Sequence, residues 1–496
     1  MSSAARIISN TPGSIAARRP APLATPLIAA AIILGVGAFA PSVFDDGDTW
    51  WHIAAGQWTL AHGAVPRLDP FSYTMSGAPW TAHEWLSEVF LALSYKAAGL
   101  SGVALLTAAA ASASAFIVGS RVARELGGIA FALIMTLSLA MLTTGLLARP
   151  HMLALPLAAA WTAGLLMARE QDRAPSLFLL PLMTLWANMH GGFAFGLALI
   201  APFALEAFLA ADRPVRRAVV FKWGRFAVLA VAAALVTPHG VEGLLFPLRL
   251  LAMANTAHIR EWQAASFSSL GPFEIALLAL LGFALLGRLR VPLVRLVLLV
   301  GLVHLSLQHF RHEMLLAIVA PMLLAEPIAK SIAASPAAGA RDLGPLAAGL
   351  AAAAAALIIV LRLAWPIPMS DGPGRPVAAI EAIPSELRGK PVLNDYDFGG
   401  YLIFAKIRPF IDGRADMFGD DYLSDYARIT SPDPDALAKT LARYAVAWTI
   451  FAPGQRVVEL MDRQPGWRRL YADRFAVVHV RSAAAGAAEE PELRGD

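Results

Sequence analysis

The sequence predicts a polytopic α-helical membrane bundle of about eleven transmembrane helices, followed by a small C-terminal soluble α/β domain. Three observations predict this fold. The 496-residue chain is 57% hydrophobic and 15% charged, with a mean hydropathy of +0.59, which indicates lipid as its main solvent. Apolar stretches of near-spanning length recur as far as Trp365. Beyond that residue the composition becomes that of a soluble module.

The expected spans are apolar stretches that approach the length needed to cross a bilayer. They lie at 23–43, 100–120, 127–147, 152–168, 176–189, 192–211, 226–238, 272–287, 296–308, 312–329 and 344–365. Several are short, so the count carries an error of about two. The first stretch follows Arg18 and Arg19 as a secretory signal would, but its length favours a retained helix.

Lys and Arg concentrate in alternate connections, which the positive-inside rule places in the cytoplasm. The cation-rich connections include Arg121/Arg124 and the segment 213–225. The expected organisation is a cytoplasmic N-terminus at 1–22, a transmembrane domain at 23–366 with a long first periplasmic loop at 44–86, a periplasmic α/β domain at 367–481 and a disordered tail at 482–496.

Strands alternating with helices predict the C-terminal α/β domain. The expected strands are 391–395, 409–412, 447–451 and 475–480, and the expected helices are 398–406, 435–444 and 455–462.

Several functional classes lose support on composition. The net charge of +4 comes from short clusters between apolar runs, which disfavours nucleic-acid binding. There is no cysteine, so thiol chemistry is excluded. The chain has no G-x-S-x-G elbow, no Walker loop and no His-Glu-x-x-His spacing. No metal ligands are assigned, and a divalent metal cofactor stays open.

The strongest candidate site opens the first loop. Asp45, Asp46 and Asp48 directly follow the first spanning stretch and precede Trp50 and Trp51. Carboxylates at a membrane surface are costly to desolvate unless they meet a proton, a cation or a hydroxyl-bearing substrate. The alternative is a solvated helix cap followed by an interfacial aromatic belt, and the residues alone favour neither.

The other candidates are cationic, imidazole and acidic groups gathered on the expected outer side. Such a collection suits a site that holds a phosphate leaving group. The alternative for each single residue is a capping or snorkelling role. The candidates are His52, His83, Glu84, Arg149, His151, His190, Arg260, His309, Arg311 and His312.

In the C-terminal domain the sharpest motif is Asp412-Gly-Arg-Ala-Asp416. A glycine between charged residues favours a tight turn with an internal Asp/Arg pair. The functional alternative is acceptor binding close to the membrane site.

Taken together, these segments resemble the GT-C superfamily of integral-membrane glycosyltransferases, which includes protein O-mannosyltransferases and bacterial lipid A sugar transferases. The resemblance rests on the acidic first outer loop after one N-terminal helix, and it extends over nearly the whole chain. The segments that carry it are Asp48-Thr-Trp-Trp-His52, His83-Glu-Trp85, Arg149-Pro-His151, Trp186-Ala-Asn-Met-His-Gly-Gly192, Asn394-Asp-Tyr-Asp-Phe-Gly-Gly-Tyr401 and Phe410-Ile-Asp-Gly-Arg-Ala-Asp-Met-Phe-Gly419.

The resemblance implies transfer of a sugar from a polyprenyl-phosphate donor to a glycan, lipid or protein acceptor, on the outer face of a bacterial plasma membrane. It implies that Asp48, or failing that Asp46, deprotonates the acceptor. Related enzymes carry an Asp-Glu pair, whereas Thr49 follows Asp48 here, so Asp46 or Glu84 is a candidate to share the role.

Two other classes compete with this interpretation. A transporter or flippase for lipid-linked sugars would place its charges at mid-membrane depth, often in broken, repeated helices. A membrane-anchored binding protein explains the C-terminal domain but leaves the acidic loop without a role.

Overall fold

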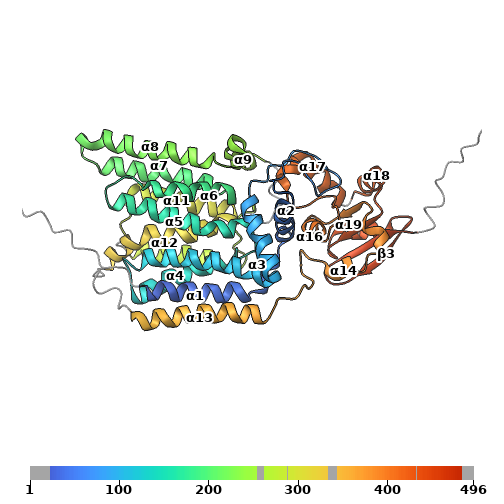
Figure 1. Ribbon diagram of the computed structural model, residues 1–496, viewed down its shortest axis with the longest axis horizontal. Helices are drawn as coiled ribbons and strands as arrows, with labels where there is room; N and C mark the ends of the chain where they lie inside the picture. The colour runs from blue at the N-terminus through green and yellow to red at the C-terminus, as the bar shows by residue number, and fades with distance from the viewer. Residues whose placement is uncertain (1–22, 254–261, 287–288, 333–342, 432, 483–496) are drawn as a thin grey trace, which may run out of the picture.

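The computed structural model describes residues 23–253, 262–286, 289–332, 343–431 and 433–482. The chain forms a long helical bundle with a C-terminal module at one end (Figure 1). The expectations for 1–22, 483–496 and Arg260 lie outside the described residues.

The bundle contains one helix at each expected apolar stretch. Its helices are α1 (Ala24–Phe39), α3 (Trp85–Val122, kinked at Ala98 and Gly99), α4 (Gly128–Thr143), α5 (Pro150–Glu170), α6 (Leu180–Met189, preceded by the 3-10 turn Leu177–Leu179), α7 (Phe193–Ala210), α8 (Arg216–Ala234), α10 (Pro272–Leu285), α11 (Leu293–Gln308), α12 (Glu313–Ser331) and α13 (Gly344–Ala364).

By helix length and hydropathy, the structure has fewer candidate membrane spans than the sequence suggested. Among the described residues, five helices are long and apolar enough to cross a membrane: 85–122, 150–170, 193–210, 310–331 and 344–364. Five further apolar helices have 10–17 residues. The eleventh, α8, begins with Arg216 and Arg217 and also carries Lys222 and Arg225. The helical bundle is confirmed, whereas a count of eleven spans is not.

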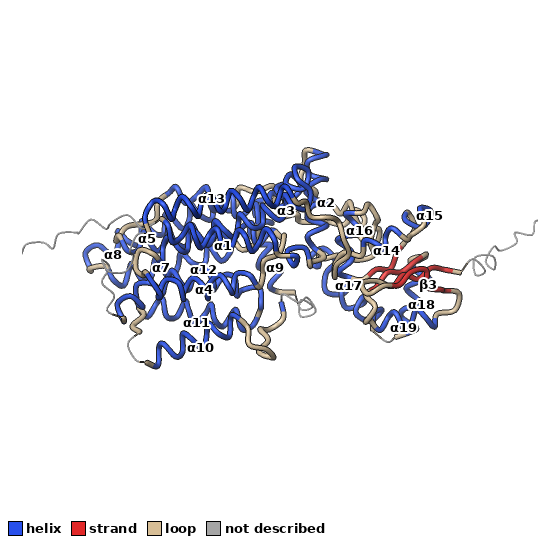
Figure 2. Tube along the Cα trace, turned by 90° about the horizontal axis from the view of Figure 1, so that it is seen from below, coloured by secondary structure: helices blue, strands red, loops and turns tan. Residues whose placement is uncertain are grey.

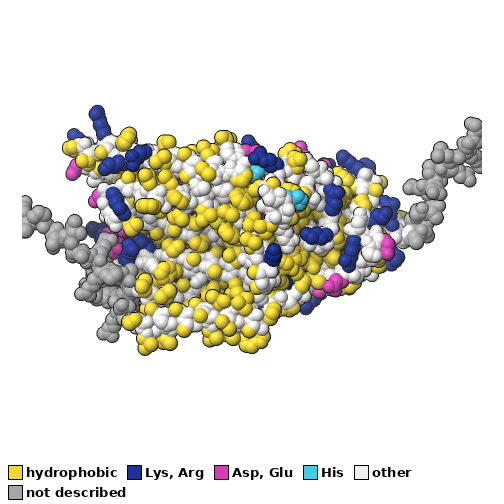
Figure 3. All heavy atoms as spheres, viewed as in Figure 1, with side chains coloured by type: hydrophobic (Ala, Val, Ile, Leu, Met, Phe, Trp, Pro, Cys, Tyr) yellow, Lys and Arg dark blue, Asp and Glu magenta, His cyan; other side chains and the backbone are white. Residues whose placement is uncertain are grey.

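Large apolar side chains cover the outside of the bundle (Figure 3). Ile129, Val228, Leu285 and Leu346 are each at least two thirds exposed. Water would make such a surface costly, whereas lipid would not. The exposed apolar surface therefore supports placement of this bundle in a membrane.

The end of the bundle far from the C-terminal module is held by a network of ion pairs. Arg121 contacts Glu170, Arg295 Nη2 lies 3.0 Å from Glu206 Oε1, and Lys330 Nζ lies 2.7 Å from Glu326. These residues belong to the cation-rich connections of the sequence. The orientation of this end in a membrane stays a prediction.

The C-terminal module contains a four-stranded sheet in the order β1-β2-β4-β3. Strand β1 pairs parallel with β2, β4 pairs antiparallel with both β2 and β3, and helices flank the strands (Figure 2). The elements are β1 (Val392–Asn394), β2 (Trp448–Phe451), β3 (Trp467–Ala472), β4 (Val477–Arg481), α14 (Val377–Glu381), α15 (Ser385–Arg388), α16 (Gly399–Phe404), α17 (Ala415–Thr430), α18 (Pro434–Arg443) and α19 (Arg456–Arg463).

One expected strand is wrong. The segment 409–412 is not a strand, because the Asn394 side chain satisfies its backbone: Oδ1 accepts from Phe410 N (2.7 Å) and Nδ2 donates to Ile411 O (2.8 Å). Four elements of the module were not foreseen: helices α14, α15 and α17 and strand β3. Strand β3 has a bulge between Arg469 and Tyr471, which breaks the alternating pattern expected of a strand.

The expected first loop contains a helix of its own. Helix α2 (Asp48–His62) lies between the bundle and the C-terminal module (Figure 1), and α9 (Gly240–Leu251) lies at the same end of the bundle. Trp50 of α2 is fully buried and packs edge-on against Tyr401 and Phe404 of the module. This aromatic packing fixes α2 as the joint between the two parts.

Candidate active site

Arg149 bridges the two candidate carboxylates at the start of α2. Its Nη1 lies 3.1 Å from Asp46 Oδ2, and its Nη2 contacts Asp48 Oδ2. All three side chains are mostly buried. The planar guanidinium fork can hold two carboxylates at once, which a lysine ammonium does less well. We call this arrangement the Asp46–Arg149–Asp48 bridge.

Local sequence sets the geometry of the bridge. Asp48 is the first residue of α2, and its N–H donates to Asp46 Oδ1 (2.7 Å), so the two carboxyl groups share one helix start. Trp51 Nε1 donates to Asp48 Oδ1 at 3.0 Å. Arg149 precedes Pro150 and is extended, as a residue before proline prefers. That conformation carries its side chain away from α5 and toward α2.

A glycine of the C-terminal module packs against Asp48. A Cβ atom built at Gly413 would overlap Asp48 Oδ1 and would lie 3.0 Å from Trp51 Nε1. A Cβ at Gly400 would likewise overlap the carbonyl of Gly47. Both glycines therefore allow a backbone approach that no side chain permits.

Beside the bridge, one carboxylate faces three imidazoles. Glu84 Oε1 lies 3.6 Å from His83 Nε2 and 3.5 Å from His190 Nε2, and its Oε2 lies 3.9 Å from His52 Nε2. The structure thus gathers four of the candidate residues from two connections that are about a hundred positions apart in the sequence.

Sequence reasoning missed Glu88 in this group. Its side chain is buried, Oε1 lies 3.3 Å from His52 Nδ1, and Oε2 has no hydrogen-bond partner among the described residues. Glu88 follows Glu84 by one helical turn, so the i, i+4 spacing was the available signal. Together Glu84, Glu88, His52, His83 and His190 form what we call the acid–histidine cluster.

The cluster's imidazoles are held neutral. Burial lowers the pKa of His83 to about 3, and burial followed by the charge of a nearby arginine lowers the pKa of both His52 and His190. A neutral imidazole donates from one nitrogen and accepts at the other. The cluster can therefore orient hydroxyl groups without adding positive charge.

The remaining candidates lie around this group. The His151 ring is 6.3 Å from that of His190, and its Nε2 lies 3.1 Å from Gly145 O. The Arg311 guanidinium lies 4.5 Å from the Trp262 ring, and its charge contributes to the lowered pKa of His190. His309 and His312 hydrogen-bond to the backbone at Trp262 O and Leu305 O. Asp45 is exposed, and its negative charge opposes the lowering of the Arg375 pKa by burial.

The Asp412-Gly-Arg motif forms the internal pair that its spacing favoured, and a third residue joins it. Arg414 Nη2 lies 2.7 Å from Asp412 Oδ2, and Nη1 lies 2.7 Å from Asp69 Oδ1, with all three side chains fully buried. Trp80 covers the guanidinium at 4.8 Å. This motif ties the first loop to the C-terminal module, a link that sequence reasoning did not foresee.

Within the part of the chain that the structure describes, no group of three or more His, Asp or Glu side chains is arranged to hold a metal ion.

Comparison with known proteins gives a fold but no family. No family model matches the chain, and no curated protein matches it. The bundle and its terminal module share their fold with a solved structure. This structure is that of the Archaeoglobus fulgidus oligosaccharyltransferase in the apo form, with a TM-score of 0.54 and 14% identity over 86% of this chain and 69% of that one.

Proposed function

We propose that this protein is a membrane glycosyltransferase that moves a sugar from a polyprenyl-phosphate donor to an acceptor on the extracytoplasmic face of a bacterial plasma membrane. The observation that carries the proposal is the Asp46–Arg149–Asp48 bridge. It brings two carboxylates and a guanidinium side by side at the end of an apolar bundle.

The bridge supports both halves of the reaction. Arginine binds phosphate through the same two-pronged geometry that it uses for carboxylates. A donor phosphate would therefore compete with Asp48 for Arg149, and its binding would free the Asp48 carboxylate to accept a proton. The base would then become available when the donor is in place.

The proposed transfer forms one glycosidic bond and breaks another bond to the same carbon. The acceptor hydroxyl oxygen attacks the anomeric carbon and forms the new glycosidic bond. The bond between that carbon and the phosphate oxygen breaks, and its electron pair leaves with the lipid phosphate. Asp48 takes the hydroxyl proton, while Arg149 stabilises the charge that develops on the leaving phosphate. His190 and Arg311 are proposed to assist with the phosphate.

The position of the polar groups argues against a transporter. The bridge and the acid–histidine cluster lie where α2, the first turn of α3 and the start of α5 meet, and Gly413 of the C-terminal module packs against Asp48. A carrier of lipid-linked sugars needs such groups near the middle of the bilayer.

The test uses purified protein in nanodiscs with a panel of radiolabelled polyprenyl-phosphate hexoses and pentoses, and cell-envelope glycans and lipids as acceptors. Wild type should transfer label from one donor. Asp48→Asn should lower the rate by about 10²–10⁴-fold, the usual contribution of a general base. The control Asp425→Asn, on the exposed face of α17, should match wild type. Full transfer by Asp48→Asn would reject Asp48 as the base, and label that crosses the bilayer without transfer would favour a transporter.

A further inference from the structure

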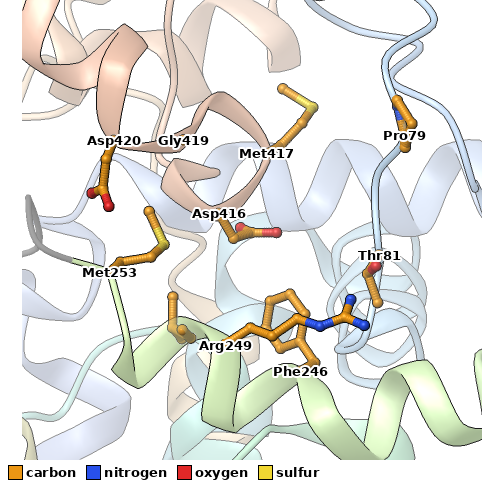
Figure 4. Close-up of a pocket in the computed structure, with 10 residues that line it drawn as sticks. Pro79, Thr81, Phe246, Arg249, Met253, Asp416, Met417, Gly419 and Asp420 are labelled. Carbon is orange, nitrogen blue, oxygen red and sulfur yellow. The ribbon is translucent and has the colours of Figure 1, made fainter.

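A cavity of about 300 Å³ lies next to the candidate active site and has no role in the reaction described above. Three segments far apart in the sequence line it: the end of the first loop, helix α9 and the start of α17 (Figure 4). Its lining includes Thr81, Phe246, Arg249, Asp416, Met417 and Asp420.

The cavity adjoins the site on two sides. Phe246 stacks on His83 with ring centroids 4.0 Å apart, and His83 belongs to the acid–histidine cluster. Asp416 follows Gly413 by three residues, and Gly413 is the glycine that contacts Asp48. The turn that closes on the candidate base therefore also supplies one wall of the cavity.

The charge of the lining disfavours a phosphate. The lining holds two carboxylates, Asp416 and Asp420, and one guanidinium, and Arg249 Nη1 already lies 3.7 Å from Glu242 Oε1. An anion would meet an excess of negative charge. Hydroxyl groups are suited to this lining, because carboxylates accept their hydrogen bonds and the guanidinium donates to their oxygens.

The remaining lining is apolar and the space is small. Phe246, Leu250, Met253 and Met417 supply hydrophobic walls. A few convergent polar groups among apolar walls are typical of small-molecule sites, and about 300 Å³ is at the lower end of their volumes. A single ring fits this description better than a chain of several residues does.

Gly419 lines the cavity at a break in helix α17. Its φ of 77° breaks α17, and a Cβ built there would have no atom within 4 Å. The break lies between the turn that carries Asp416 and the residue Asp420, and both carboxylates line the cavity.

We propose that this cavity is the acceptor subsite and binds an uncharged, hydroxyl-rich sugar ring of a glycan acceptor. The assignment of this site to the acceptor rests on the proposed transferase function. Sugar binding itself can be tested without transfer.

The experiment measures binding of three simple sugars to the full-length protein in nanodiscs by saturation-transfer difference NMR. The probes are methyl β-D-glucopyranoside, methyl α-D-mannopyranoside and methyl β-D-galactopyranoside. Leu250→Trp fills the cavity, and Asp420→Asn removes one acceptor of hydroxyl protons. Their matched controls are Leu248→Trp and Asp421→Asn, neighbouring exposed residues outside the lining.

At least one probe should bind wild type. The Kd should rise at least about tenfold in Asp420→Asn, since a hydrogen bond to a charged group is worth that much. It should rise by at least as much in Leu250→Trp, because the indole fills the space that the sugar ring needs. Both controls should bind like wild type. Binding of no probe, or equal binding by wild type and Leu250→Trp, overturns the subsite. If instead sugar binding follows this pattern while Asp48→Asn keeps full transfer, the proposed base fails and the sugar site stands.

Discussion

The Cα atom of Gly413 lies so close to the Asp48 carboxylate that an added methyl group would overlap Oδ1. One residue comes from the C-terminal module and the other from the start of α2. The module therefore forms part of the wall around the candidate base. This contact explains why a glycine separates Asp412 from Arg414.

Gly413→Ala should displace Asp48 while leaving the fold intact. We expect transfer to fall by about 100-fold, the effect of a misplacement of about 1 Å at a reacting group. Steady-state transfer rates measure this loss. Gly454→Ala, whose added Cβ would meet no atom within 4 Å, is the control and should keep wild-type activity. Equal activity of the two variants would show that the module does not position Asp48.

Arg149→Lys should weaken donor binding. A single ammonium cannot reproduce the two-pronged contact with Asp46 and Asp48, nor the same contact with a phosphate. We expect the donor KM to rise by at least about tenfold, equivalent to about 1.4 kcal/mol, with a smaller change in the acceptor KM. The two KM values from initial rates decide this, and an unchanged donor KM would remove Arg149 from phosphate binding.

Arg414→Met should destabilise the protein. The substitution leaves Asp69 and Asp412 as buried carboxylates without their shared partner. Breaking a buried ion pair in this way costs about 3–5 kcal/mol. Thermal unfolding followed by tryptophan fluorescence should show a clear drop in Tm. Arg428→Met, which breaks an exposed pair with Asp425, should cost at most about 1 kcal/mol. Similar Tm values for the two variants would contradict a structural role for Arg414.

Asp416→Asn should stabilise the protein at neutral pH. Burial raises the pKa of the Asp416 carboxyl from 3.8 to about 6. The folded state therefore binds more protons than the unfolded state between these values, and stability contributed by this group falls as pH rises through that window. Above pH 6 the penalty is complete, up to about 3 kcal/mol.

The measurement compares Tm of wild type and Asp416→Asn at pH 4.5 and pH 7.5. The variant's advantage should be larger at pH 7.5, whereas Asp421→Asn, on an exposed neighbour, should show no such dependence. If the difference in Tm did not change with pH, burial of the ionised Asp416 carboxylate would not destabilise the folded state.

The sequence alone determined the helical bundle, the polar C-terminal module and the residue types of the site, because hydrophobic runs and helix breaks are local features. It also indicated the Asp412/Arg414 pair, whose members are two residues apart. The sequence did not predict strand β3, because a bulge breaks its alternating pattern. It wrongly predicted a strand at 409–412, where a hydrogen bond from the backbone to the Asn394 side chain replaces strand pairing.

Only the tertiary structure decided which candidates meet. Arg149 reaches Asp46 across 103 positions, Arg414 reaches Asp69 across 345, and Glu84 meets His190. These pairings depend on how the helices pack and on where the module docks against α2. Neither is encoded in the spacing of any single segment, because contacts between distant parts of the chain are set by the shape of the whole fold.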